Sequence, residues 1–483
     1  MHATASRVLN LLPAGGIPAH LFAIAGFLLA FSLVARLMSE KRAPANTFAW
    51  LLVIVLLPYV GVPLYLLIGG RKLRRIAGQK GRLLPSLPDR FAESGAKRTL
   101  RPIATAVVAA GGLPPVCGNK VRLLATGEEE FAALEEQIRG AKHCIHITTF
   151  ILSRDETGRR IVSLLAARAR EGIKVRLLLD AVGCLGSRGR FVKPIRAAGG
   201  EVGRFMPVVP FTSRGSANLR NHRKIAVFDH ARAIVGGRNL AREYMGRDSF
   251  PKRWRDLGAA IDGPAAALLN EVFIADWCFA TRQPPETLHA EFSDQAVEPC
   301  GEGELQVVAS GPDVPGDPLY EGIVAMIQEA ERSIWIVTPY FIPDDVLLRS
   351  LIVKARAGRS VTLVVPARSN HRIADFARRQ YLRELRKAGA RLLLYTPGML
   401  HAKAIIIDDQ LALFGSPNFD VRSLFVNFEV GVLAHSKPEV AAITAWAEAL
   451  MKECVEFKAD PNPKRKIFGN VAEDISRLLA PLL

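Results

Sequence analysis

The sequence predicts an α/β protein with two similar mixed-sheet halves that share one active site, preceded by two transmembrane helices. Three observations support this fold class. A polar motif that begins with histidine occurs twice with the same spacing. Helix-like segments alternate with apolar, β-branched segments around each copy, as in sheets covered by helices. Two long uncharged runs lie at the N-terminus, and each is long enough to cross a bilayer.

The N-terminal residues 1–70 are predicted to form a membrane anchor. The segments of about 17–38 and 47–70 are rich in Leu, Val, Ala and Phe, and each exceeds the roughly 20 residues needed to span a bilayer. Their length and number argue against buried core helices or a signal peptide. The path of the second segment is left open by Pro58, Gly61 and Pro63.

Basic residues set the predicted orientation of the chain. A dense cluster follows the second segment: Arg71, Lys72, Arg74, Arg75, Lys80 and Arg82. By the positive-inside rule, all later residues should face the cytoplasm of a bacterial inner membrane. The whole chain has 64 Lys and Arg against 46 Asp and Glu, a net charge of +18, and its mean hydropathy is +0.16. Such a chain should attract phosphate-rich partners, either nucleic acid or an anionic bilayer.

The six cysteines predict neither a metal cluster nor a redox pair. They are far apart in the sequence and form no Cys-x-x-Cys pair. We interpret them as reduced and structural, which fits a reducing compartment for the globular part.

The rest of the chain divides by composition and repetition. Residues 71–118 are basic and then rich in Pro and Gly, which predicts a linker. Residues 119–297 form the first half, and an acidic, Gly-rich linker is expected at 298–316. Residues 317–483 form the second half and end in a predicted helix, which is amphipathic enough to lie on a membrane but could equally be a core helix.

The duplicated motif is the strongest functional signal. Its spacing from histidine to asparagine agrees between the two copies, which are His222, Lys224, Asp229, Gly236, Gly237 and Asn239, and His401, Lys403, Asp408, Gly415, Ser416 and Asn418. The residues after each lysine are apolar and predict a buried strand, on which residues two apart share a face. Histidine and lysine should therefore point the same way in each half.

Two histidines, two lysines and two asparagines that meet at one point suit a phosphodiester reaction. One imidazole attacks phosphorus, and the other protonates the leaving alkoxide and then deprotonates the incoming alcohol. The lysines and asparagines offset the charge of the phosphoryl oxygens, so neither a metal nor another cofactor is expected. Gly237 allows close approach to the phosphate, and Ser416 adds a hydroxyl donor.

Four carboxylates are expected to support the site. Glu429 and Asp256, which lie downstream of His401 and His222, are candidates to bond the second nitrogen of an imidazole and so fix its tautomer. Asp229 and Asp408 are grouped with the catalytic histidines and lysines because they share the motif, and they are expected to make strand-end hydrogen bonds that hold the site together.

The two motifs and their flanks resemble the phospholipase D superfamily, in particular the bacterial cardiolipin synthases. The flanks that carry the resemblance are 220–224, 254–256, 271–277, 338–344, 399–403, 422–429 and 479–483. The resemblance implies two phospholipase D-type sandwich halves and transfer of a phosphatidyl group between two phosphatidylglycerol molecules, with release of glycerol. It also favours His222 as the nucleophile. Gly237 departs from the serine often found there, and Pro417 precedes Asn418.

Three other functions remain open at this point. A phospholipase D would resolve the phosphohistidine with water, and the sequence does not separate hydrolysis from transfer. A nuclease would also use this chemistry, but it gains nothing from two bilayer anchors, so no nucleic-acid partner is expected. A non-catalytic scaffold is disfavoured because both motifs are complete. The acyl preference and the oligomeric state are not predicted.

Overall fold

The computed structural model describes residues 101–457 except 188, 208–218, 293–296 and 315, together with 31, 51–56, 59, 61 and 62. The chain divides into two compact units, Met1–Arg74 and Arg75–Leu483. The predicted transmembrane segments lie almost entirely outside the described residues, as does the predicted C-terminal helix. Among the residues that are described, no helix is both long enough and apolar enough to span a membrane.

The first half alternates strands and helices. Its elements are β1 (Val116–Leu124), α7 (Gly127–Gly140), β2 (Cys144–Thr149), α8 (Glu156–Arg170), β3 (Lys174–Asp180), α9 (Lys193–Ala197), β4 (Glu201–Phe205), β5 (Ile225–Phe228), β6 (Arg232–Gly236), β7 (Gly258–Asp262), α10 (Pro264–Thr281) and α11 (Pro285–His289). Local sequence explains where α7 begins. Thr126 accepts the backbone N–H of Glu129, whose carboxylate accepts the N–H of Thr126 in return, which forms a capping box.

The second half repeats this order. Its elements are β8 (Gly303–Ser310), α12 (Pro318–Glu329), β9 (Ser333–Val337), β10 (Phe341–Ile342), α13 (Asp345–Arg356), β11 (Ser360–Pro366), α14 (Arg372–Lys387), β12 (Arg391–Tyr395), β13 (Ala404–Ile407), β14 (Leu411–Gly415), β15 (Phe419–Asp420), α15 (Val421–Phe425), β16 (Glu429–Ala434), α16 (Lys437–Lys452) and β17 (Cys454–Glu456). One more helix, α6 (Pro102–Ala109), precedes β1 and packs on α12.

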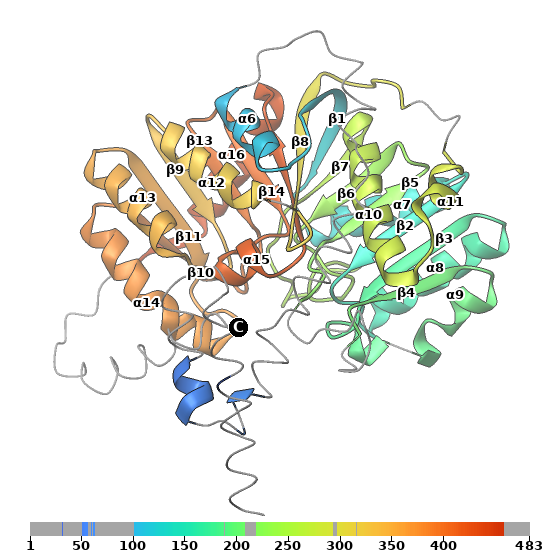
Figure 1. Cartoon of the computed structure of the whole chain (residues 1–483). Helices are drawn as coiled ribbons and strands as arrows, with labels where there is room; N and C mark the ends of the chain where they lie inside the picture. Colours follow the sequence, from blue (N-terminus) through green and yellow to red (C-terminus); the bar gives the residue numbers. More distant parts are fainter. Residues whose placement is uncertain are drawn as a thin grey trace, which may run out of the picture. The chain divides into compact units, whose positions relative to one another are not determined.

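Fifteen strands of the described chain form one mixed sheet. Their order is β17-β12-β11-β9-β13-β14-β16-β8-β1-β7-β6-β5-β2-β3-β4. The seven strands that follow β8 in this order, from β1 to β4, belong to the first half. β8 belongs to the second half and joins them by antiparallel pairing with β1. Figure 1 shows the two halves on either side of this junction. The predicted mixed-sheet α/β fold is therefore confirmed.

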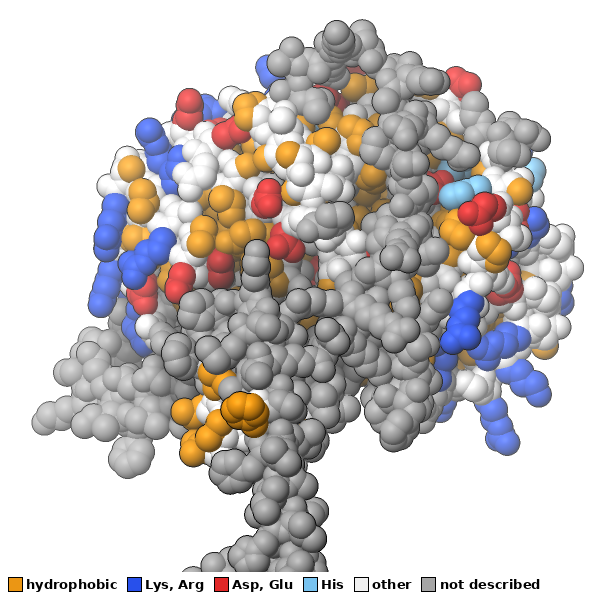
Figure 2. All heavy atoms as spheres, viewed as in Figure 1, with side chains coloured by type: hydrophobic (Ala, Val, Ile, Leu, Met, Phe, Trp, Pro, Cys, Tyr) orange, Lys and Arg blue, Asp and Glu red, His pale blue; other side chains and the backbone are white. Residues whose placement is uncertain are grey.

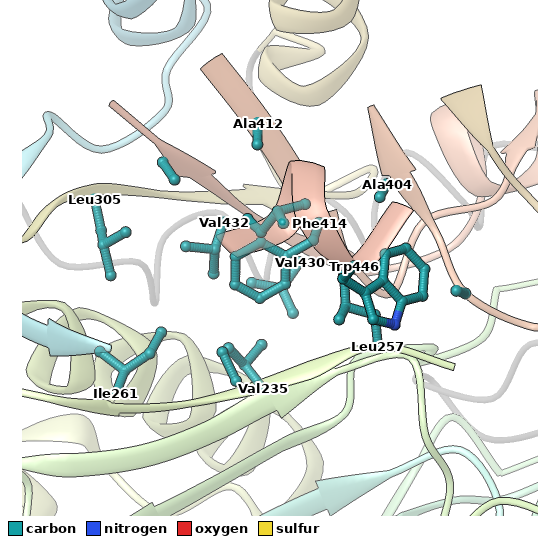
Figure 3. Packing of buried hydrophobic residues seen from close by; sticks show 14 of the residues in the cluster. Val235, Leu257, Ile261, Leu305, Ala404, Ala412, Phe414, Val430, Val432 and Trp446 are labelled. Atoms are coloured by element: carbon teal, nitrogen blue, oxygen red, sulfur yellow. The ribbon is translucent and has the colours of Figure 1, made fainter. Parts of the chain in front are cut away.

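Helices cover both faces of the strands. On the outer faces, α7 and α8 cover the first half, and α12, α13 and α14 cover the second. On the inner faces, α10 and α16 contribute to one apolar core that both halves share. Figure 3 shows Phe414 and Val430 of the second half facing Val235 and Ile261 of the first. Burial of this layer removes apolar surface from water and holds the halves in one arrangement.

Two predicted linkers contain regular structure. Residues 298–316 include β8, which pairs with β16 along its length and with β1 at two positions. Residues 71–118 include α6 and the start of β1. β8 and α6 have only eight residues each and are flanked by Gly and Pro. Their apolar runs were therefore too short to be recognised in the sequence. All six cysteines are free thiols.

Candidate active site

Both motif histidines lie just before a fully buried strand. His222 precedes β5, and His401 precedes β13, at equivalent places in the two halves. Backbone hydrogen bonds between the halves hold both segments. The N–H of His222 donates to the carbonyl oxygen of Phe428 at 2.9 Å, and the N–H of His401 donates to that of Arg255 at 2.7 Å. The backbone of each histidine is therefore fixed by the opposite half.

The carboxylates that bond the imidazoles also come from the opposite half. Nδ1 of His222 lies 2.9 Å from Oε1 of Glu429 and 3.0 Å from Oε2. Nδ1 of His401 lies 2.7 Å from Oδ2 of Asp256. Asp256 and Glu429 are completely buried. At His222, the Glu429 carboxylate accepts a hydrogen bond from Nδ1, which places the proton there and leaves the lone pair that could react on Nε2.

The motif lysines point to the same side as the histidines, as the strand spacing predicted. Nζ of Lys224 donates to the carbonyl oxygen of His222 at 2.6 Å, and Nζ of Lys403 bonds the carbonyl oxygen of His401 and lies 2.7 Å from its Nδ1. Burial lowers the pKa of Lys403 to about 8 and that of Lys224 well below that of a free lysine, against the opposing charges of the nearby carboxylates.

Both imidazoles are neutral near pH 7. Burial lowers the pKa of His222 to about 4, although Glu429 acts to raise it. Burial and then the ammonium of Lys403 lower the pKa of His401 to about 3, against the charge of Asp256. A neutral imidazole is the form that can act as a nucleophile or a base.

Charges from each half act on the histidine of the other. The ammonium of Lys403 lowers the pKa of His222, and that of Lys224 lowers the pKa of His401. The interaction between two charges weakens with distance, and beyond about one Debye length it is largely screened. The two histidines and two lysines therefore form one cluster at the junction of the halves.

The positions after the second strand of each motif differ between the halves. Ser416 donates its hydroxyl to Oε2 of Glu429, and its oxygen accepts the N–H of Val430 at 2.9 Å. At the equivalent Gly237, a Cβ atom would lie only 2.2 Å from Oδ1 of Asp256. Glycine is therefore required in the first half because the Asp256 carboxylate fills the space of a side chain.

The motif asparagines are both buried. Oδ1 of Asn239 accepts the N–H of Ile151 at 3.1 Å, which orients its amide group. Oδ1 of Asn418 is buried without a hydrogen-bond partner in the described part of the chain. Each lies three residues after the end of a strand, β6 or β14, and Asn418 lines a small cavity together with Lys403.

Asp229 and Asp408 lie away from the cluster, at the opposite ends of β5 and β13 from the histidines. Asp229 accepts the backbone N–H groups of residues 142–144 at 2.7 to 3.1 Å, and Asp408 accepts those of residues 331–333 at 2.6 to 2.8 Å. A four-residue strand of about 13 Å separates each from its histidine. Both therefore tie strands together, and neither reaches the atoms that react at the imidazoles.

Sequence reasoning missed a buried ion pair behind the first histidine. Nη1 of Arg223 bonds Oδ1 of Asp276 on α10 at 2.6 Å, and both side chains are inaccessible to solvent. Nε of Arg223 donates to the backbone carbonyl oxygen of Glu429 at 3.0 Å. Successive side chains of an extended segment point to opposite faces, so Arg223 points away from the site. The sequence around Arg223 did not identify its partner.

Aromatic rings surround both imidazoles. The ring of Phe150 lies 5.1 Å from that of His222, and the rings of Tyr244 and Trp254 lie 5.0 and 5.5 Å from that of His401. They exclude water and strengthen the electrostatic interactions in the site. Trp254 lies in the flank 254–256, one of those that carry the family resemblance. Tyr244 lies outside every motif and flank, so the sequence did not identify it.

Comparisons with known proteins place this geometry in a family. The family model described as cardiolipin synthase, phospholipase D-like domain matches residues 134–277 and 323–451, one match in each half. A second model, phospholipase D-nuclease N-terminal, matches residues 27–70. The cardiolipin synthase of Geobacillus sp. (strain WCH70) is 34% identical over 92% of this chain and 90% of its own length.

The chain belongs to the cardiolipin synthase family of the phospholipase D superfamily. Other similar members are the cardiolipin synthase of Geobacillus thermodenitrificans, at 35% identity, and cardiolipin synthase 1 of Bacillus cereus, at 33%, both over 92% of this chain and 90% of the relative. A crystal structure of phosphatidylserine synthase from Haemophilus influenzae shares the fold, with a TM-score of 0.59 at 17% identity over 79% of this chain and all of that chain. The resemblance inferred from the motifs is confirmed.

Proposed function

We propose that this member of the cardiolipin synthase family transfers a phosphatidyl group from one phosphatidylglycerol to another and releases glycerol. The observation that carries the proposal is the pair of imidazoles, His401 buried and His222 partly exposed, each bonded through Nδ1 to a carboxylate of the opposite half. The names of the relatives support the lipid product. The lysines and asparagines offset the charge on the phosphoryl oxygens, so the scheme needs no metal.

In the first step, Nε2 of His222 attacks the phosphorus of the donor. The bond from phosphorus to the headgroup oxygen breaks, and His401 gives its proton to the departing glycerol. His401 has to be protonated for this step, and a bound phosphodiester anion raises its pKa from the low value of the free site. Lys224, Lys403 and the two motif asparagines stabilise the charge that develops on the phosphoryl oxygens.

In the second step, the neutral His401 takes the proton of a glycerol hydroxyl on the acceptor lipid. The hydroxyl oxygen attacks phosphorus, the bond between phosphorus and His222 breaks, and cardiolipin leaves. Both imidazoles return to their starting states, so no nucleotide or water is consumed. The assignment of His222 as nucleophile rests on the family resemblance.

We further propose that residues 1–70 anchor the enzyme in the bacterial cytoplasmic membrane by two spans, with the catalytic unit on the cytoplasmic side. The uncharged segments, the basic cluster after Gly70 and the match to an N-terminal family model over 27–70 support this topology.

The test is product distribution from labelled phosphatidylglycerol in vesicles. Cardiolipin and glycerol in equal amounts are expected. Phosphatidic acid without cardiolipin would show that water resolves the intermediate, and the transferase proposal would then be wrong.

A further inference from the structure

A basic cavity lies in the second half, apart from the imidazole cluster. It occupies about 630 Å³ between the ends of β11 and β12 and the first turns of α14. Four arginines line it together with apolar side chains that include Phe376 and Leu382; the arginines are Arg368, Arg372, Arg378 and Arg379. Asp375 is the acidic residue in the wall. Four positive charges against one negative charge leave the wall with a net charge of +3.

Arg378 is the most deeply buried of these arginines. Arg378 is only 5% exposed, and its Nη2 donates to the carbonyl oxygen of Pro366 at 2.7 Å and lies 2.9 Å from Asp375. Its Nη1 is buried and has no hydrogen-bond partner in the described part of the chain. Its contacts fix the guanidinium in the wall of the cavity, where its positive charge favours a ligand with acceptor oxygens. Arginine suits phosphate oxygens in particular.

Apolar side chains are exposed on the helix that lines the cavity: Phe376 belongs to the cavity wall, and Ile373 follows Arg372 of the wall in the sequence. Ile373 and Phe376 are 42% and 38% exposed on the first turns of α14, and the guanidinium of Arg379 lies 4.6 Å from the ring centre of Phe376. A soluble phosphate would gain nothing from these side chains. A phospholipid offers a phosphate for the arginines and a hydrocarbon surface for Ile373 and Phe376.

The cavity opens at the end of the sheet that carries the active site. β9 and β11 are parallel, with Val337 beside Val364, and the cavity begins where β11 ends at Pro366. His401 lies just beyond Ala404, which pairs with Val337 at the same end. Tyr340 links the two regions, because it follows β9 and its hydroxyl bonds Asn370 in the loop before α14. Figure 2 shows Lys and Arg side chains on the side where α13 and α14 lie.

We propose that this cavity binds the phosphate of an anionic phospholipid that is not being turned over, and so docks the catalytic edge of the second half on the bilayer. The bound lipid would hold the shared site toward the surface from which phosphatidylglycerol must come. This docking site goes beyond the proposed reaction, because it needs no chemistry at the bound lipid.

Hydrogen exchange of the full-length protein in neutral detergent micelles tests binding without turnover. Adding phosphatidic acid should slow exchange of the backbone amides in residues 367–382, and adding phosphatidylcholine should not. The R372Q/R379Q variant should lose this protection. The matched R386Q/K387Q variant removes two charges from the same helix outside the cavity and should keep it.

Each other result of this experiment overturns the proposal. No slowing by phosphatidic acid in the wild type would mean that the cavity binds no lipid. Equal slowing by inorganic phosphate at the same concentration would mean a site for soluble anions. Equal loss in both double variants would mean unspecific attraction. Unchanged exchange in the first half shows that the variants are folded, and none of these readouts depends on whether the enzyme transfers or hydrolyses.

Kinetics on phosphatidylglycerol vesicles test the docking role. R372Q/R379Q should raise the apparent KM by about 10- to 30-fold, as expected for two charges near an anionic surface, and leave kcat within about twofold. R386Q/K387Q should change KM by less than about threefold. A fall in kcat with KM unchanged would place the cavity in the chemical step and overturn the docking role.

Discussion

The two half-sites carry the same reacting groups but are supported by different chemistry. The segment before the first motif is polar: Asn221 donates its amide to Asp276 at 2.8 Å, and its N–H bonds Asp180 at 3.0 Å. The equivalent segment of the second half holds Met399 and Leu400, which are both buried, and Leu400 belongs to the apolar core. Duplication has therefore kept the histidine and lysine while their surroundings diverged, which is how two identical side chains can take different roles.

The same divergence appears at the residue between histidine and lysine. Arg223 in the first half is buried and paired with Asp276, while Ala402 in the second half is simply packed. Arg223 also bonds the backbone of Glu429, so it positions the carboxylate that orients His222. The first imidazole is thus held by a chain of charged contacts, and the second is held mainly by Asp256 and aromatic rings.

The largest expected effect separates the two histidines. H222A and H401A should each reduce cardiolipin formation by at least about 10⁴-fold. A donor lipid with a p-nitrophenol headgroup needs no protonation of its leaving group. H401A should therefore still release p-nitrophenol in a single burst and hold phosphohistidine, while H222A should not. A burst in H222A that is absent in H401A would reverse the assigned roles.

The carboxylates should follow the histidine that they contact across the halves. E429Q should slow phosphohistidine formation by about 10³-fold, because it misorients His222. D256N should leave the burst with the p-nitrophenol donor largely intact and slow its resolution by a similar factor. Rapid-quench measurement of the two steps checks this. If E429Q slowed only resolution, the cross-half pairing would not operate in catalysis.

Exchanging the residues at the Gly237 and Ser416 positions should have unequal effects. G237A places a Cβ atom against Asp256 and should lower kcat by about 100-fold, since displacement of a catalytic group by about 1 Å costs that much. S416A removes one hydrogen bond to Glu429 and should cost about tenfold. Steady-state kinetics and thermal unfolding of both variants make the comparison, with S416G as a control for backbone freedom. Equal losses would contradict it.

The smallest expected effect is the dependence of kcat/KM on pH, which we attribute to Lys403 at high pH. Lys403 has a pKa of about 8, so its charge is present below that pH and is lost above it. Above about pH 8 we expect kcat/KM to fall by a further factor of about ten per pH unit as phosphate stabilisation is lost, in addition to the fall caused by deprotonation of His401. It should also fall below about pH 4, where His222 becomes protonated. K403R should move the alkaline limit upward, and an unchanged limit would exclude Lys403 as its source.

The sequence predicted those features of the site that occur in both copies of the motif. Equal spacing in the two copies identified the histidines, lysines and asparagines, and the period of a strand put each histidine and lysine on one face. The partner of each histidine could not be predicted. Asp256 and Glu429 were recognised as candidates, but their pairing depends on how the halves dock through the core of α10 and α16, which no local pattern records.

Other features escaped prediction for similar physical reasons. β8 lies in a Gly-rich acidic segment that resembles a linker, and only its pairing with β16 and β1 makes it a strand. The partner of Arg223 is 53 residues away on a helix. Asp229 and Asp408 were grouped with the reacting residues because they share the motif. Their expected strand-end hydrogen bonds are present, at the far ends of the strands.

The exchange of carboxylates between halves has a consequence during synthesis of the chain. Glu429 follows His222 by 207 residues. At about 5 to 20 residues per second, a ribosome needs about 10 to 40 s to make the distance between them. Throughout that interval the emerging first imidazole has no group to orient it. A nascent or truncated chain that ends before residue 429 therefore lacks the carboxylate that orients its first imidazole.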